Sequence, residues 1–144
     1  MSGNDGYELT VFSMADYDEV MALWTGMEGI GVNPSDEREP MIAYLERNPG
    51  LSLVARADGR LVAAVLCGHD GRRGYLHHLA VHPEHRGRGL GRRMVTVCLE
   101  QLAALGIPKC NAFLYADNDP GERFWQAVGF AQRVDLKVIQ RVTG

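Results

Sequence analysis

The stretch LAVHPEHRGRGLGRRMV, residues 79–95, joins the end of an expected strand to the start of an expected helix. Pro83 stops the strand 75–82, because proline lacks the backbone N–H that a strand ladder needs. Beyond Gly89, apolar residues recur at helical spacing for about four turns. Gly106 is the residue expected where such a helix ends. The loop between Pro83 and Gly89 therefore leads into a helix N-terminus.

This loop has the composition of an anion-binding site. The first backbone N–H groups of a helix have no partner within the helix, and the helix dipole adds partial positive charge there. Gly87, Gly89 and Gly91 leave those N–H groups uncovered, and glycine reaches the positive φ values that turn successive N–H groups inward. Arg86 and Arg88 add charged hydrogen-bond donors. We predict that the loop binds a pyrophosphate.

Other interpretations of the loop are a solvated basic turn, a dinucleotide-binding turn and a P-loop. Its position between a strand and a strongly periodic helix disfavours a merely solvated turn. The dinucleotide fingerprint needs G-x-G-x-x-G at the first turn of a βαβ unit, whereas residues 87–91 read G-x-G-x-G after antiparallel hairpin strands. A P-loop needs a Gly-Lys pair, which the chain lacks. We expect neither of these two nucleotide sites.

Charge is unevenly distributed along the chain. Residues 72–93 carry a formal net charge of +5, whereas the whole chain carries −3 at pH 7. A nucleic-acid-binding domain is usually basic over a whole face, and a pI near 5.9 argues against one. The anion expected at the loop is therefore a small phosphorylated ligand.

Length and composition favour one globular domain over 1–144, because 144 residues with 46% hydrophobic content can form a single core. The chain has no secretory signal pattern and no apolar run long enough to span a membrane, so a cytoplasmic protein is expected. Cys67, Cys98 and Cys110 lie in apolar segments without the spacing of metal ligands. We expect three buried thiols and no metal.

The remaining patterns predict an α/β (α+β) fold with helices on a mixed, mostly antiparallel sheet. Asp58 and Gly59 mark the turn of a hairpin. Ser13 with Asp16 forms a capping box, and Asp119 is expected to cap the last helix. The expected order is β-α-α-β-β-β-α-β-α-β. Its strands are 7–12, two within 51–68, then 75–82, 110–117 and a closing strand at 134–142, and its second helix is 36–47.

Two motifs resemble the GNAT superfamily of N-acetyltransferases. Residues 86–91, RGRGLG, match its [QR]-x-x-G-x-[GA] signature, and 79–95 are similar to its central motif throughout. Asn118 followed by ERFWQAVGF, 122–130, is similar to the family's N…(F/L)-Y-x-x-x-G-F element. The expected order of elements resembles the GNAT fold over residues 7–142. The resemblance implies an acetyltransferase that uses acetyl-CoA.

The resemblance also implies where acetyl-CoA binds. The ligand would lie in a cleft where the strand 75–82 parts from the strand 110–117. The backbone at 79–81 would pair with the pantetheine arm like an added strand, and the amides at 86–91 would hold the pyrophosphate. The implied cofactor-binding residues are Leu79, Ala80, Val81, Arg86, Gly87, Arg88, Gly89, Leu90, Gly91, Asn118 and Trp125.

Acetyl transfer to an amine needs a neutral amine, a polarised carbonyl and a proton for the leaving thiolate. In the family the amine commonly attacks the thioester directly, so no protein nucleophile is implied. Strand alternation places Tyr75, His77, Leu79 and Val81 on one face and His78 on the other. Tyr75 and His77 fall where some family members carry the group that draws the amine's proton, so they are the candidate catalytic residues. A structural, hydrogen-bonded role is the alternative for His77.

The sequence departs from the family at Trp125, where the usual residue is a tyrosine that protonates the thiolate. An indole N–H is not an acid at neutral pH, so Tyr115, a bound water or unassisted departure is expected instead. Residues 15–39 carry a formal net charge of −6 and are expected near the acceptor. Glu28, in the glycine-rich break of that segment, is the candidate contact for a cationic amine.

The leading hypothesis is an N-acetyltransferase acting on a primary amine of a small molecule, peptide or protein. A non-catalytic acyl-CoA sensor is the alternative that Trp125 favours, and an RNA-binding loop is disfavoured by the acidic remainder of the chain. No nucleic-acid or membrane partner is expected. Family members often pair as dimers, so a homodimer is one assembly to expect.

Overall fold

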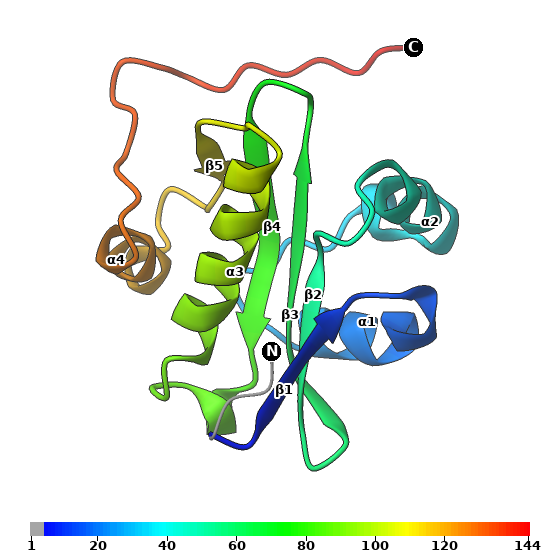
Figure 1. Ribbon diagram of the computed structural model, residues 1–144. Coiled ribbons are helices and arrows are strands. Elements are labelled where there is room, and N and C mark those ends of the chain that lie inside the picture. Colours follow the sequence, from blue (N-terminus) through cyan, green and yellow to red (C-terminus); the bar gives the residue numbers. More distant parts are fainter. Residues whose placement is uncertain (1–4) are drawn as a thin grey trace.

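The computed structural model describes residues 5–144, so the first four residues of the predicted domain lie outside the described part. The strands are β1 (Tyr7–Val11), β2 (Leu53–Ala57), β3 (Arg60–His69), β4 (Gly74–Val81) and β5 (Cys110–Ala112). The helices are α1 (Tyr17–Thr25), α2 (Arg38–Arg47), α3 (Leu90–Ala104) and α4 (Asp119–Ala127). Three short 3-10 turns are η1 (Met14–Asp16), η2 (Pro34–Asp36) and η3 (Pro83–His85). One sheet lies between α1 and α2 on one side and α3 and α4 on the other (Figure 1).

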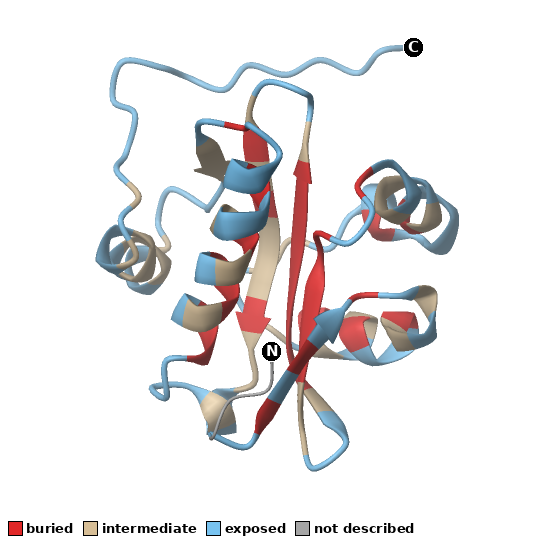
Figure 2. Ribbon diagram, in the orientation of Figure 1, coloured by how far each residue is buried: buried red, intermediate tan, exposed pale blue. Residues whose placement is uncertain are grey.

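The five strands follow one another across the sheet in the order β1-β2-β3-β4-β5. The first four are antiparallel neighbours, and β5 runs parallel to β4. The central strand β3 is buried from residue 62 to 68 (Figure 2), because strands flank it and helices cover both of its faces. The β4–β5 ladder is short and joins only residues 74–76 to residues 110–112.

Two hydrophobic clusters, one on each face of the sheet, hold the layers together. Met94 and Cys98 of α3 are buried in the cluster that we call the α3 cluster. Val20 and Trp24 of α1 and Met41 of α2 are buried in the second, which we call the α1–α2 cluster. The hydrophobic spacing that predicts helices in the sequence is therefore the spacing of residues that face the sheet. The predicted fold class is confirmed.

Local signals in the sequence act where they were expected. The backbone N–H of Ser13 donates to Asp16 Oδ2 at 3.0 Å. Asp58 and Gly59 have φ of 50° and 78°, as the two-residue hairpin turn requires. After α3, Gly106 has φ of 80° and its N–H bonds to the carbonyl of Ala103 in a Schellman ending.

The predicted closing strand at 134–142 does not form. Its residues alternate in polarity, yet Val134 is 86% and Val138 73% exposed, and residues 131–144 pair with no strand. Alternation specifies a strand only where a neighbouring strand can receive it. The free edge of the sheet is β5, whose three residues are too few to pair with nine. The order of elements therefore ends with α4.

Two boundaries near α4 also differ from the prediction. The strand expected at 110–117 ends at Ala112, where its pairing with β4 stops. Asn118, not Asp119, caps α4: its Oδ1 accepts the N–H of Gly121 at 3.0 Å. Pro120 then falls one position later in the helix than expected. Within the described residues, no helix has both the length and the apolar character needed to cross a membrane.

We expect the three cysteines to be unreactive in the folded protein. Cys67 and Cys98 are buried and Cys110 is half-buried. Burial raises the pKa of the Cys110 thiol to about 12, and a hydrogen bond with Cys98, together with burial, raises the pKa of Cys67. Because the thiolate is the reactive form, Ellman's reagent at pH 8 should label the native protein at least about 10-fold more slowly than the unfolded chain. Denaturation should release three reactive thiols, and rapid native labelling of Cys110 would contradict its burial.

Candidate functional site

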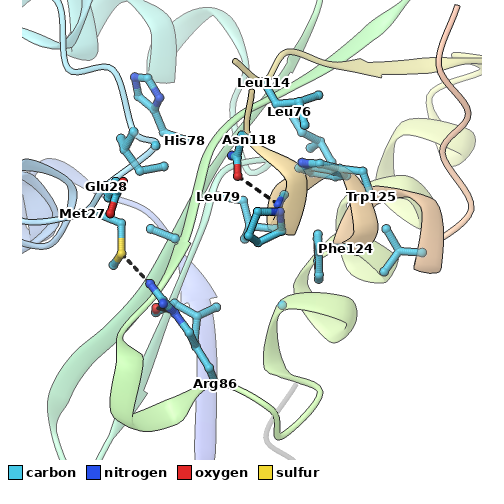
Figure 3. Close-up of a pocket in the computed structure, with 18 of the residues that line it drawn as sticks. Met27, Glu28, Leu76, His78, Leu79, Arg86, Leu114, Asn118, Phe124 and Trp125 are labelled. Atoms are coloured by element: carbon cyan, nitrogen blue, oxygen red, sulfur yellow. Dashed lines mark hydrogen bonds between the residues drawn. The ribbon is translucent and has the colours of Figure 1, made fainter. Parts of the chain in front are cut away.

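A cleft opens where β4 and β5 part. Beyond the three paired residues, β4 continues to Val81, whereas residues 113–118 form no strand. The space between them has a volume of about 1230 Å³. Met27, Glu28 and His78 lie along one wall, and Asn118, Phe124 and Trp125 lie along the opposite wall (Figure 3).

The loop that leads into α3 has the backbone shape that the sequence predicts. Gly87 and Gly89 have φ of 76° and 78°, a conformation that side-chain-bearing residues rarely adopt. A Cβ atom on either would meet nothing within 4 Å, so the positive φ and not crowding requires glycine there. Gly89 is the N-cap of α3, and both glycines line the cleft. Unpaired N–H groups at the start of α3 therefore face a space in which an anion can bind.

Gly91 has a different role from the two preceding glycines. It is buried in the first turn of α3, where a Cβ atom would lie 3.2 Å from the ring of Phe124. Its absent side chain lets α4 pack closely against the start of α3. The three glycines therefore have two roles. Gly87 and Gly89 allow the loop conformation, and Gly91 lets α4 pack against the start of α3 beside the cleft.

Arg86 and Arg88 point in different directions, although the sequence suggested equivalent roles. Arg86 lines the cleft, and its guanidinium donates from Nε to the carbonyl of Val81 at 3.0 Å and lies 2.7 Å from Met27 Sδ. Arg88 is absent from the lining formed by the described residues, and its Nη1 donates to the Tyr7 hydroxyl at 3.4 Å. The other ten implied cofactor-binding residues all line the cleft.

A bulge in β4 reverses the alternation of its side chains. It lies at His78, which has φ of 54°. Leu79 and Val81, beyond the bulge, pack against the α3 cluster, whereas His77, before it, pairs with a residue of the α1–α2 cluster. The prediction that these three residues and Tyr75 share one face is therefore wrong, because the extra residue of a bulge flips every later side chain.

Tyr75 and His77 lie together but only one of them reaches the cleft. Their rings are stacked 6.2 Å apart, and each lies 6.0 Å from the ring of Phe113. His77 lines the cleft, whereas Tyr75 is not among the described residues that do so. Burial, with a smaller contribution from the neighbouring His78, lowers the pKa of His77. The neutral imidazole is therefore favoured at this position.

His78 also lines the cleft, on the same side of β4 as His77. Its Nε2 lies 2.8 Å from Oδ2 of Asp36, a buried residue with 3% exposure. Its ring packs edge-on against Trp24 with centroids 4.9 Å apart. The sequence gives no signal for this pair, because both the bulge and the approach of η2 to β4 depend on the tertiary fold.

The loop between α1 and η2, residues 26–33, closes over one end of the cleft. Two of its glycines approach the opposite wall: a Cβ atom on Gly29 would lie 3.4 Å from Asn118 Nδ2, and one on Gly31 would overlap the hydroxyl of Tyr115. Glu28 immediately precedes the first of these glycines and lines the cleft. The expected position of Glu28 beside the site is therefore the observed one.

Three of the six other acids of the 15–39 segment form ion pairs away from the cleft. Arg56 binds Asp16 at 2.8 Å and Glu19 at 2.9 Å, and Arg38 binds Asp18 at 2.9 Å. Those carboxylates hold α1 to β2 and α2 and do not line the cleft. Within residues 5–144, no group of three or more potential metal ligands is placed to hold a metal ion.

Comparison with known proteins agrees with this geometry. Residues 17–130 match the model of the acetyltransferase (GNAT) family. An acetyltransferase of Yersinia enterocolitica is 37% identical over 131 residues, which cover 90% of this chain and 87% of that protein.

Solved structures with low sequence identity share the fold. The aminoglycoside 6'-N-acetyltransferase AAC(6')-Ih of Acinetobacter baumannii superposes with a TM-score of 0.78 at 17% identity, over 96% of this chain and all of that one. N-acetylglutamate synthase of Neisseria gonorrhoeae, solved with coenzyme A and N-acetylglutamate, gives a TM-score of 0.67 at 20% identity, over 88% of this chain and 28% of that one. With the family match and the Yersinia relative, the conclusion is that the chain belongs to the acetyltransferase (GNAT) family.

Proposed function

We propose that the protein is an acetyl-CoA-dependent N-acetyltransferase that acetylates a primary amine of a small molecule, peptide or protein by direct attack within a ternary complex. The observation that carries the proposal is the start of α3, where Gly87 and Gly89 open backbone N–H groups toward the cleft between β4 and β5. Three free thiols suit the reducing cytoplasm, where we place the protein.

The residues present fit coenzyme A. A diphosphate suits the bare N–H groups and the helix dipole at 86–91, and Arg86 adds a charged donor within the cleft. An extended pantetheine arm suits the β4 backbone at Leu79–Val81, because that edge of β4 has no strand partner beyond residue 76. The coenzyme bound to the neighbouring fold of N-acetylglutamate synthase supports the same class of ligand.

The leaving thiolate needs a proton that Trp125 cannot supply, because an indole N–H is not acidic at neutral pH. Trp125 lies in the cleft wall with its ring against Phe124 and Phe130, which is the setting of a packing residue. Tyr115 lines the same cleft and carries a phenol, so it is our candidate proton donor. A bound water or unassisted departure of the thiolate are the alternatives.

A non-catalytic acyl-CoA sensor is the second candidate, and Trp125 at the usual tyrosine position favours it. Calorimetry with coenzyme A and thiol release from acetyl-CoA over a panel of primary amines separate the two functions. Binding with amine-dependent thiol release supports the enzyme, binding without release supports the sensor, and absence of binding contradicts both.

Replacement of Gly89 by Ala should weaken coenzyme A binding by about 10-fold. A left-handed conformation costs a residue with a Cβ atom roughly 1–2 kcal/mol, and relaxing from it in the free protein turns the N–H groups away from the ligand. Isothermal titration calorimetry measures the change. Gly50→Ala is the matched control, because Gly50 has the same φ of 78° and equally open surroundings but lies outside the cleft. Equal affinity in the two variants would contradict the role of the loop.

Replacement of Glu28 by Gln should raise the KM for a cationic amine by about 5-fold and leave the KM for acetyl-CoA unchanged, since it removes the carboxylate from the acceptor wall. Steady-state kinetics with the best amine from the panel tests this. Glu39→Gln, which changes an exposed acid of α2 outside the cleft, should leave both values unchanged. A matching rise in both variants would show a general effect of net charge.

Replacement of Tyr115 by Phe should lower kcat by about 10-fold without weakening coenzyme A binding, if the phenol protonates the thiolate. Stopped-flow or steady-state thiol release gives kcat, and calorimetry gives the affinity. An unchanged kcat would exclude Tyr115 as the donor and leave a bound water or unassisted departure of the thiolate.

A further inference from the structure

His78 has a backbone conformation that is rare for a residue with a side chain. Among residues 5–144, only His78 and Asp58 combine a side chain with a positive φ. Asp58 lies in a hairpin turn, where this conformation is usual, but His78 lies within β4 at the bulge. Such a conformation is unfavourable for a residue with a Cβ atom and persists only where surrounding contacts enforce it. It also places the imidazole of His78 on the same side of the sheet as α1 and η2.

Asp36, which contacts the imidazole of His78, is itself held in place by other hydrogen bonds. Its Oδ2 accepts the backbone N–H of Asn33 at 3.0 Å, and its carbonyl accepts the hydroxyl of Tyr17 at 2.6 Å. The carboxylate is therefore fixed by its own turn before His78 Nε2 reaches it at 2.8 Å. Trp24 packs against the ring from α1 and excludes water from this side.

The second ring nitrogen of His78, Nδ1, has no hydrogen-bond partner among the described residues, and His78 is part of the cleft lining. When Nε2 carries the ring proton and donates it to Asp36, Nδ1 presents a lone pair. This is the arrangement in which a carboxylate fixes the tautomer of an imidazole base.

The titratable groups near His78 lie on several different segments of the chain. Asp36 approaches from η2 and His77 precedes it on β4, while Glu28 and Tyr115 belong to the same cleft. The carboxylate of Asp36 is the one charged group in hydrogen-bond contact with His78 among residues 5–144. His77 has no such carboxylate partner in the described part of the chain, and burial beside Tyr75 and Phe113 disfavours its protonation.

We propose that His78, and not His77, is the general base of the acetyl transfer, and that Asp36 is the positioning residue that fixes its tautomer. The inference rests on the proposed function. It assigns a role to a residue that strand alternation had placed on the wrong side of the sheet.

Acetyl transfer begins with loss of a proton from the acceptor amine. Nδ1 of His78 takes one proton from the acceptor ammonium and becomes an imidazolium. The lone pair of the amine then forms the C–N bond at the thioester carbonyl carbon, and the C–S bond breaks with its electrons on sulfur. The phenol of Tyr115 gives its proton to the sulfur and regains one from the second N–H of the attacking nitrogen, and the imidazolium returns its proton to solvent.

The test compares the pH dependence of kcat/KM, with the best amine of the panel, in wild type and variants. His78→Gln should lower kcat/KM by about 100-fold and abolish the acid limb of the profile, whereas Asp36→Asn should lower it by about 10-fold. His69→Gln, at the far end of β3 and outside the cleft, should match wild type. Loss of the acid limb in His77→Gln, with its retention in His78→Gln, would overturn the assignment.

A second readout does not depend on turnover. The ¹⁵N shifts of the neutral His78 ring should show the proton on Nε2 in wild type, and Asp36→Asn should lose that preference. A proton on Nδ1 in wild type would overturn the proposal. If wild type acetylates no amine at all, the proposed function fails and the base assignment fails with it. An active wild type with an unaffected His78→Gln variant contradicts the base alone.

Discussion

The separation of β4 from β5 is the constraint on which the rest of the structure depends. Their ladder stops after three residue pairs, so the far edge of β4 carries backbone N–H and C=O groups that have no partner strand. Backbone groups in a protein interior need a partner, and an unpaired edge beside a cleft therefore favours an extended ligand. The same separation leaves room beside β4 for the start of α3 and for α4, which carries Phe124 and Trp125. A continuous ladder would close the cleft.

The bulge at His78 gives the two sides of the cleft different chemistry. Beyond the bulge, Leu79 and Val81 turn toward α3, so β4 presents apolar side chains on that side of the sheet. His77, just before the bulge, and His78, at the bulge, both face the α1–α2 side of the sheet. Glu28 and Asp36 lie on that side. Regular alternation would place one histidine on each side. One extra residue thus separates an apolar side of β4 from a side that carries imidazole and carboxylate groups.

Much of this site could be predicted from short-range signals. The glycines at 87 and 89, the cap and Schellman ending of α3 and the turn at Asp58 are all set by conformational preferences of single residues, which sequence carries directly. The missing closing strand and the reversed face of β4 were not predictable in this way. Both depend on how a segment pairs with its neighbours in the sheet. Residues 134–142 pair with no strand, and β4 has one more residue than β3 at the bulge, which reverses the faces of its later side chains. Arg88 illustrates the same limit, because its direction is set by contact with Tyr7 far away in the chain.

The edge of β4 that has no strand partner also affects how a protein of this family can evolve. Recognition through main-chain atoms does not depend on the side chains of the same strand, so under the proposed function a gene duplicate can change Glu28 on the opposite side of the cleft while the main-chain contacts of β4 with the coenzyme persist. Under that proposal, acceptor preference and coenzyme binding can change independently of each other.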